Sequence, residues 1–175
     1  MQRLIASELV SAMNATSFRE VLKDFAAGVT IVTSADEHGV PVGATVSSFA
    51  SLSLEPPLVL VCLKSDSRTV AAIRERGAFS VHILERSQSE LARRFAAELE
   101  EKFRPGSYEL NSAGVPCLSG CKNRLDCRLE NDFSGGDHRI MVGRVESTLA
   151  ADAFRPLVYA QRGFFGLGEP VSETK

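Results

Sequence analysis

Residues 43–63 read GATVSSFASLSLEPPLVLVCL, and they join two strand patterns through a run of small hydroxyl residues. The first pattern, Val40 to Val46, ends in this run, and Pro56-Pro57 introduce the continuously apolar stretch Leu58 to Leu63. A short apolar run bounded by polar residues is typical of a strand buried on both faces, so we expect it at the centre of a sheet. Small side chains would also let a flat ring approach the backbone, with amides and hydroxyls available for its polar edge or for a phosphate. The alternative, an ordinary strand end rich in Ser and Thr, stays open.

Hairpins and short helices are expected around this segment. The β-branched stretch Val29 to Ala35 and the turn residues Asp36 to Gly39 predict a hairpin with the strand at Val40. Upstream, Thr16 to Ala26 has helical spacing behind a capping box of Ser17 and Glu20, and Gly28 is expected to end that helix. The other expected elements are a helix from the cap Ser67 to about Glu75, a strand over Ala78–Leu84, a helix carrying Leu91, Phe95 and Leu99 behind a capping box of Ser87 and Glu90, a half-exposed strand over Cys121–Glu130, a turn at Gly135-Gly136, and strands over His138–Leu149, Leu157–Gln161 and Phe164–Leu167.

The fold class follows from the order of these elements. Many short strands joined by tight turns, with helices at irregular intervals, favour an antiparallel barrel over a doubly wound parallel sheet. We therefore expect a mainly β protein with a few inserted helices. The length of 175 residues fits one domain with its own core. We place that domain at residues 16–168, with tails at 1–15 and 169–175.

Composition excludes several classes of protein. The net charge of −2 comes from 20 basic and 22 acidic residues mixed along the chain, so no basic face for nucleic acid is expected. No apolar run approaches the ~20 residues of a membrane helix, and the N-terminus lacks a secretory signal pattern, which predicts a cytoplasmic protein. The four cysteines form no CxxC pair and have no His at ligand spacing, so we expect buried reduced thiols and no metal site.

Familiar catalytic and nucleotide motifs are missing from the sequence. It contains no GxSxG, GxxxxGK[ST] or HExxH motif, and no helix pattern follows the GxG at Gly166 to Gly168. Two weaker signals remain. Ser65 to Thr69 could bind a phosphate at a helix N-terminus, although such a run is more often a simple cap. His138, at the turn Gly136-Asp137-His138, could hydrogen-bond a ligand or be an ordinary surface residue, whereas His82 in an apolar strand is expected to be a satisfied core or interface residue.

In this order and spacing, the motifs resemble the short-chain flavin reductases, the reductase components of two-component flavin-dependent monooxygenases. The resemblance covers roughly Phe18 to Gly168. It implies a split β-barrel that binds flavin. The motifs that carry it are Ala27 to Thr33, Gly43 to Ser53 with Pro56 to Leu63, Ser67-Arg68-Thr69, Arg94-Phe95-Ala96 with Lys102-Phe103, and Gly136-Asp137-His138 leading into Val142-Gly143 and Val145.

The resemblance also implies roles for individual residues. The isoalloxazine ring would be held by the strand end Thr45, Val46, Ser47 and Ser48, within a stretch that continues to Ser51, with Cys62 and Leu63 beside the ring. The phosphate or ribityl end would contact Ser67, Arg68 and Thr69, and Phe95, Ala96 and Lys102 would close that side. The candidate catalytic residue His138 would face the nicotinamide, with Tyr159 and Gly28 nearby. The family often has Asn at the positions of Asp66 and His82, and an acid beside a phosphate is unfavourable unless it points away or pairs with Arg68.

The implied activity is an NAD(P)H:flavin oxidoreductase that reduces free FMN or FAD. Hydride transfer from nicotinamide C4 to flavin N5 needs two stacked rings and no protein acid or nucleophile, so His138 would orient the carboxamide. NADH is expected rather than NADPH, and reduced flavin would diffuse to a partner monooxygenase. The resemblance further implies a homodimer. Two alternatives stay open: a flavin-binding or sensor module, and a pyridoxamine phosphate oxidase-like enzyme that holds FMN permanently and would need more basic phosphate ligands near Ser67.

Overall fold

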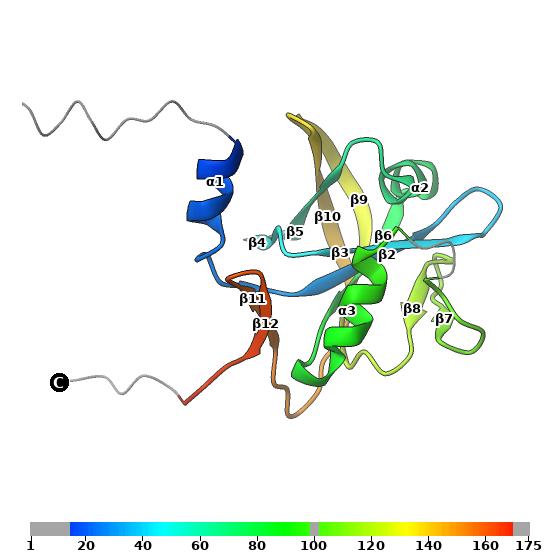
Figure 1. The fold of residues 1–175 in the computed structure, drawn as a ribbon. Coiled ribbons are helices and arrows are strands. Elements are labelled where there is room, and N and C mark those ends of the chain that lie inside the picture. Colours follow the sequence, from blue (N-terminus) through cyan, green and yellow to red (C-terminus); the bar gives the residue numbers. More distant parts are fainter. Residues whose placement is uncertain (1–14, 99–101, 170–175) are drawn as a thin grey trace, which may run out of the picture.

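The computed structural model describes residues 15–98 and 102–169, and Figure 1 shows a curled β structure with short helices at its periphery. Seven antiparallel strands form the main sheet, in the order β3-β2-β6-β9-β10-β5-β4. Their bounds are β2 Thr30–Ala35, β3 Pro41–Val46, β4 Phe49–Leu54, β5 Pro57–Lys64, β6 Ala78–Ile83, β9 Asn123–Gly135 and β10 His138–Leu149.

The main sheet closes on itself because of one short connection. Strands β3 and β4 lie at opposite ends of the sheet order, yet only Ser47 and Ser48 separate them in the chain. A flat seven-stranded sheet would place its two edges far apart, since neighbouring strands are spaced about 4.8 Å. The sheet must therefore curl, and β3 comes into contact with β5. The predicted mainly β, antiparallel split barrel is confirmed.

Two smaller sheets and the helices complete the fold (Figure 1). None of the described helices has the length and apolar character needed to span a membrane. The three-stranded sheet is β1-β11-β12 (Ala27–Gly28, Leu157–Ala160, Gly163–Gly166), and the two-stranded sheet is β7-β8 (Tyr108–Leu110, Pro116–Leu118). The helices are α1 Ala15–Leu22, α2 Arg68–Arg76, α3 Ser89–Ala96 and the 3₁₀ turn η1 Arg86–Gln88.

Apolar side chains fill the barrel and a second layer outside it. The barrel interior is built around Val61, Phe79, Val81 and Met141, each fully buried. Gly143 lies where β10 passes this core, and a Cβ there would come within 2.4 Å of the Phe79 ring, so only glycine fits. The second layer packs α3 against the outer face of the sheet, with Ile31, Leu84, Phe95, Leu118 and Leu157.

The strand buried on both faces is not the one expected. Leu58 to Leu63 lies in β5, next to the edge strand β4, and its residues alternate between buried and half-buried, so the expected central position is wrong. Strand β2 is buried at every residue instead. Its polar side chains are satisfied by backbone carbonyls: Thr30 Oγ1 donates to Val46 (2.8 Å), Thr33 Oγ1 to Pro116 (2.6 Å) and Ser34 Oγ to Ala78 (2.9 Å).

The helix starts were predicted with mixed success. Ser67 caps α2 as expected, because its side chain accepts from the Val70 amide at 3.3 Å. The other two capping boxes are wrong: α1 begins at Ala15 and ends at Leu22, so Ser17 lies inside it and Gly28 falls in β1. The box ahead of α3 is formed by Glu85 and Gln88 around η1, and Leu99 lies outside the described residues. Strands β1, β4, β7 and β8 were not expected.

Three of the four cysteines are buried, and none of the four forms a disulfide in the structure. Burial raises the pKa of Cys121 to about 11 and that of Cys127 to about 12, which keeps these thiols protonated and unreactive. Within the described ranges, no group of three or more His, Cys, Asp or Glu side chains could hold a metal ion.

His82 on β6 is a satisfied core residue, as expected. It is 0% exposed, its Nδ1 lies 3.2 Å from the Ile31 carbonyl, and its Nε2 accepts from the Leu118 amide at 3.0 Å. A ring that donates through Nδ1 and accepts through Nε2 is neutral. Burial lowers the pKa of His82 from 6.5 to about 4.

From the lowered pKa of His82 we predict that folding stability depends on pH. The unfolded chain takes up the proton near pH 6.5 and the folded chain only near pH 4, so stability falls as the pH drops through that window, by about 3 kcal/mol in total. His82→Asn should flatten this part of the profile, measured by urea unfolding at pH 7, 6 and 5. His38→Asn, at an exposed turn, is the control. Parallel profiles for wild type and His82→Asn would contradict the assignment.

Candidate functional site

A cavity of about 540 Å³ lies where the start of β3 faces the N-terminal end of α2. That volume is in the range of small-molecule sites in proteins. One wall is the strand segment 40–44, the other is formed by α2 and the chain leading into it, and a third side comes from residues after α3. The lining residues are Val40, Pro41, Val42, Gly43, Ala44, Lys64, Asp66, Ser67, Arg68, Thr69, Glu98, Lys102 and Phe103.

Cations outnumber acids in this cavity. Lys64, Arg68 and Lys102 line it together with two acids, Asp66 and Glu98. Lys102 Nζ is held in place by donating to the carbonyls of Gly43 (3.2 Å) and Phe95 (3.0 Å). Burial, and secondly the charge of Arg68, lower the pKa of Lys102. Both causes disfavour the charged ammonium, so a bound anion at this place would stabilise it.

The N-terminus of α2 strengthens this preference for an anion. Its first turn carries no acidic residue, and its cap Ser67 and first residues Arg68 and Thr69 line the cavity, at the helix end where free amides and the positive end of the dipole lie. Thr69 is buried in the wall, and the Ser67 hydroxyl is already engaged as the cap. Positive side chains and helix amides at one place make the cavity suitable for a phosphate group.

Of two further predicted residues, Phe95 supports the cavity from behind and Ala96 does not line it. Phe95 is buried, and its ring packs edge-to-face on Phe103 with centroids 5.0 Å apart. A Cβ at Gly43 would lie only 3.0 Å from the Phe95 ring, so glycine lets β3 lie directly on α3. Ala96 is the exposed last residue of α3. Phe95 therefore shapes the floor, and it is Phe103 that lines the space.

The serine-rich segment forms a separate, exposed surface at the other end of β3. Ser47, Ser48 and Ser51 are exposed, and Ser48 is fixed to β5 by two hydrogen bonds with Cys62, its hydroxyl donating to the Cys62 carbonyl and its carbonyl accepting from the Cys62 amide, each at 3.0 Å. Thr45 Oγ1 donates to the Ala92 carbonyl at 2.7 Å. The remaining two predicted residues, Val46 and Leu63, are both 4% exposed with side chains in the barrel core, so only their backbones could meet a ligand.

His138 is brought to the cavity side of the barrel by the β9–β10 hairpin. It is the first residue of β10 and lies opposite Lys64 in the β5–β10 register. Its Nδ1 is 2.7 Å from Asp137 Oδ1, and this hydrogen bond lowers the pKa of Asp137. The Ser65 amide donates to the Asp137 carbonyl at 3.0 Å, which ties the hairpin turn to the segment that enters α2.

Gly28 and Tyr159 lie elsewhere, on the three-stranded sheet. Gly28 pairs with Val158 and Ala27 with Tyr159, and the Tyr159 ring contacts that of Phe164 with centroids 5.4 Å apart. Neither residue is in the wall of the cavity. Their expected place beside the nicotinamide stays a prediction.

Comparison with known families identifies the chain. Residues 22–168 match the family model described as a flavin reductase like domain. The chain belongs to the flavin reductase-like family. The match covers both walls of the cavity, the serine-rich segment and His138, so the features described above are parts of this family's domain.

Individual relatives agree with this assignment. The flavin reductase is 41% identical over 156 residues to the reductase subunit of a flavin-dependent monooxygenase from Rhodococcus jostii, covering 89% of this chain and 80% of that protein. It is 41% identical over 158 residues to the reductase component of a 4-nitrophenol monooxygenase from Rhodococcus opacus, covering 90% and 83%. An NADH:FAD oxidoreductase of Streptomyces globisporus, solved with NAD and FAD fragments, superposes with a TM-score of 0.82 at 30% identity, covering 97% of this chain and 100% of that chain.

Sequence reasoning missed two charged residues of the cavity, Lys64 and Glu98. Lys64 directly follows the apolar run Leu58 to Leu63, and a cation at the end of a buried strand could have indicated an anion site there. Glu98 lies beyond the end of α3 and carries no local signal. Both depend on the closing of the barrel, which a linear pattern does not reveal.

A substitution at Asp66 tests whether the flavin phosphate binds in this cavity. Asp66→Asn removes one negative charge from the cavity wall, so the affinity for FMN should rise about two- to fivefold, while riboflavin, which has no phosphate, should bind unchanged. Titration of flavin fluorescence measures both. Asp152→Asn, on the exposed loop before β11, should change neither affinity. An equal effect of Asp66→Asn on FMN and riboflavin would show that the phosphate lies elsewhere.

Proposed function

We propose that this flavin reductase uses NADH to reduce FMN or FAD that it holds only transiently, and that the reduced flavin leaves for a partner monooxygenase. Flavin reduction itself follows from the family, and its relatives are named as reductase components of monooxygenases. The observation that carries the proposal is the cation-lined cavity at the N-terminus of α2, with the exposed serine segment and His138 on the same barrel.

The residues present fit a flavin. Lys64, Arg68 and Lys102 suit its phosphate, and the exposed backbone and hydroxyls of Ser47 and Ser48 suit the polar edge of the ring. Bound flavin supplies the hydride acceptor, so the chain has to position rings and exclude competing reactions. Val46 and Leu63 hold the strand backbones in place because their side chains are anchored in the core.

His138 is proposed to orient the nicotinamide. Asp137 engages Nδ1, which leaves Nε2 as the ring nitrogen for the carboxamide. The pairing of Asp137 with Ser65 fixes the turn, so the imidazole has a rigid base. NADH is proposed over NADPH, in line with the name of the Streptomyces oxidoreductase.

The charges of the cavity favour a flavin that leaves over one that is permanently bound. Three cations are offset by Asp66 and Glu98, which weakens the hold on a phosphate. An oxidase with permanently bound FMN would need a more positive site. A flavin that serves as substrate requires modest affinity, since the reduced form must dissociate in every turnover.

Oligomeric state, domain limits and location complete the proposal. We propose a homodimer, because α1 exposes Phe18, Val21 and Leu22, buries none of its own residues, and is followed by the exposed Phe25. The domain is proposed to span residues 16–168, supported by the family match at 22–168. Four cysteines without a disulfide are consistent with the proposed cytoplasmic location.

The function is tested by following NADH absorbance with the purified protein. We expect slow oxidation without added flavin and a rate that rises and saturates as FMN or FAD is added. NADPH in place of NADH should give a lower rate. FMN that copurifies tightly, with no NADH oxidation when free flavin is added, would overturn the proposal in favour of a permanently bound cofactor.

His138→Ala tests the orienting role of the imidazole. Loss of one hydrogen bond to the carboxamide should raise the KM for NADH about five- to tenfold. The dissociation constant for flavin, measured without NADH, should stay within twofold and serves as the internal control. Unchanged kinetics for NADH would remove His138 from the site.

A further inference from the structure

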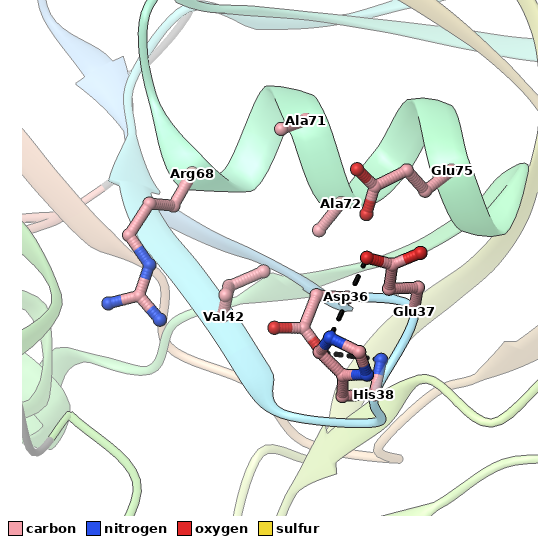
Figure 2. A pocket seen from close by; sticks show the side chains of 8 residues that line it. All are labelled: Asp36, Glu37, His38, Val42, Arg68, Ala71, Ala72 and Glu75. Carbon is pink, nitrogen blue, oxygen red and sulfur yellow. Dashed lines mark hydrogen bonds and ion pairs between the residues drawn. The ribbon is translucent and has the colours of Figure 1, made fainter.

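A second, smaller cavity adjoins the first one (Figure 2). It has a volume of about 210 Å³, and it shares Val42 and Arg68 with the larger cavity. Complete small-molecule sites are usually about 300 Å³ or larger, so the smaller cavity is suited to one part of a ligand. The shared residues show that the two cavities are contiguous, so a ligand that filled both would pass along Val42 and Arg68.

The small cavity has opposite polarity at its two ends. Figure 2 shows Arg68 at one end, and Glu37 and Glu75 at the other. Arg68 also lines the larger cavity, together with Lys64 and Lys102. Glu75 lies seven positions after Arg68 on α2, which corresponds to about 10 Å along the helix axis. Between them, Val42, Ala71 and Ala72 form a wall of short apolar side chains.

Hydrogen bonds fix the walls of the cavity. Arg76 on α2 donates from Nε to the Ala35 carbonyl (2.8 Å) and from Nη2 to the Asp36 carbonyl (2.7 Å), which holds the β2–β3 turn against the helix. Asp36 Oδ1 accepts from the amides of His38 (3.0 Å) and Val40 (2.8 Å). The carboxylates of Glu37 and Glu75 are therefore carried on two elements that are clamped together.

We propose that this cavity binds the adenosine half of a dinucleotide whose phosphates lie at Arg68. The inference rests on the proposed function, in which the larger cavity receives the phosphate end of the flavin. Ribose hydroxyls and the adenine amino group donate hydrogen bonds, and carboxylate oxygens accept them. Acidic residues bind the ribose hydroxyls in this way in other nucleotide sites. The apolar wall suits a flat base, and the acids exclude a phosphate from that end.

Two ligands of the proposed reaction, FAD and NADH, carry an adenosine half. The shared wall at Arg68 makes the cavity a continuation of the flavin phosphate site, so we assign it to FAD. FMN and riboflavin lack the adenosine group and would leave the cavity unused. FAD should therefore bind more tightly than FMN.

The test compares dissociation constants for FAD, FMN and riboflavin, measured by flavin fluorescence in the absence of NADH. Ala71→Leu places a larger side chain in the cavity at an exposed helix position where Leu is also a good helix former. It should weaken FAD at least about tenfold and FMN by less than twofold. The double variant Glu37→Gln with Glu75→Gln removes the two carboxylates, and about fivefold weaker FAD binding is expected. Glu109→Gln, on the exposed face of β7, is the matched control.

The arms of the experiment separate FAD from NADH. If the variants leave FAD binding unchanged but raise the KM for NADH with riboflavin as acceptor, the cavity holds the adenosine of NADH. If neither changes, or if FAD and FMN weaken equally, the adenosine site is overturned while flavin reduction stands. Wild-type protein that binds none of the three flavins would overturn the proposed function itself. If Ala71→Leu does not fold, the double variant Glu37→Gln with Glu75→Gln still tests the adenosine site.

Discussion

The connection Ser47-Ser48 is the constraint on which the rest of the structure depends. Two residues link β3 to β4, the two edge strands of the seven-stranded sheet, so the sheet has to curl until these edges meet. Ser48 fixes the closure through its two hydrogen bonds with Cys62 on β5. Because β5 runs back from β4, its end at Lys64 returns to the start of β3. The chain from Lys64 into α2 therefore faces residues 40–44, and the cavity is formed where barrel closure brings them together.

The parts of this fold that could be predicted are those with local causes. The hairpin of β2 and β3, the cap Ser67 and the turn at Gly136 each depend on residues a few positions apart. The burial of β2 could not be predicted, because Thr33 and Ser34 are satisfied by carbonyls of Pro116 and Ala78, far along the chain. A strand with three polar residues looks half-exposed until those partners are known. For Leu58 to Leu63 the error was the opposite one, because burial on both faces was predicted from the continuous apolar run. The strand lies next to the edge strand β4, and only one of its faces is fully buried.

The residues of the candidate site also divide into those that local sequence signals predicted and those that depend on contacts far along the chain. Ser67, Arg68 and Thr69 were predicted because a cap, a cation and a hydroxyl at a helix start are local signals for phosphate, and the structure places all three in one cavity wall. Lys102 was identified only through the family resemblance, and its bonds to the carbonyls of Gly43 and Phe95 explain its position. Lys64 and Glu98 needed the closed barrel. Residues such as Gly28 and Tyr159, on a different sheet, could contribute only if the bound ligand or a second subunit reaches them.

The balance of charge in the cavity is better suited to turnover than to tight binding. A site for a resident cofactor gains from every added cation, whereas a site for a flavin substrate must release its product after one hydride transfer. Asp66 and Glu98 lower the positive potential, and two of the three N–H donors of Lys102 are engaged by backbone carbonyls, so only one is left for a phosphate. Hydride transfer requires no proton from the protein, and Asp137 fixes the His138 ring through Nδ1. In the proposed function the chain therefore contributes position, which barrel closure supplies, and the charge balance of its cavity suits a flavin that has to leave.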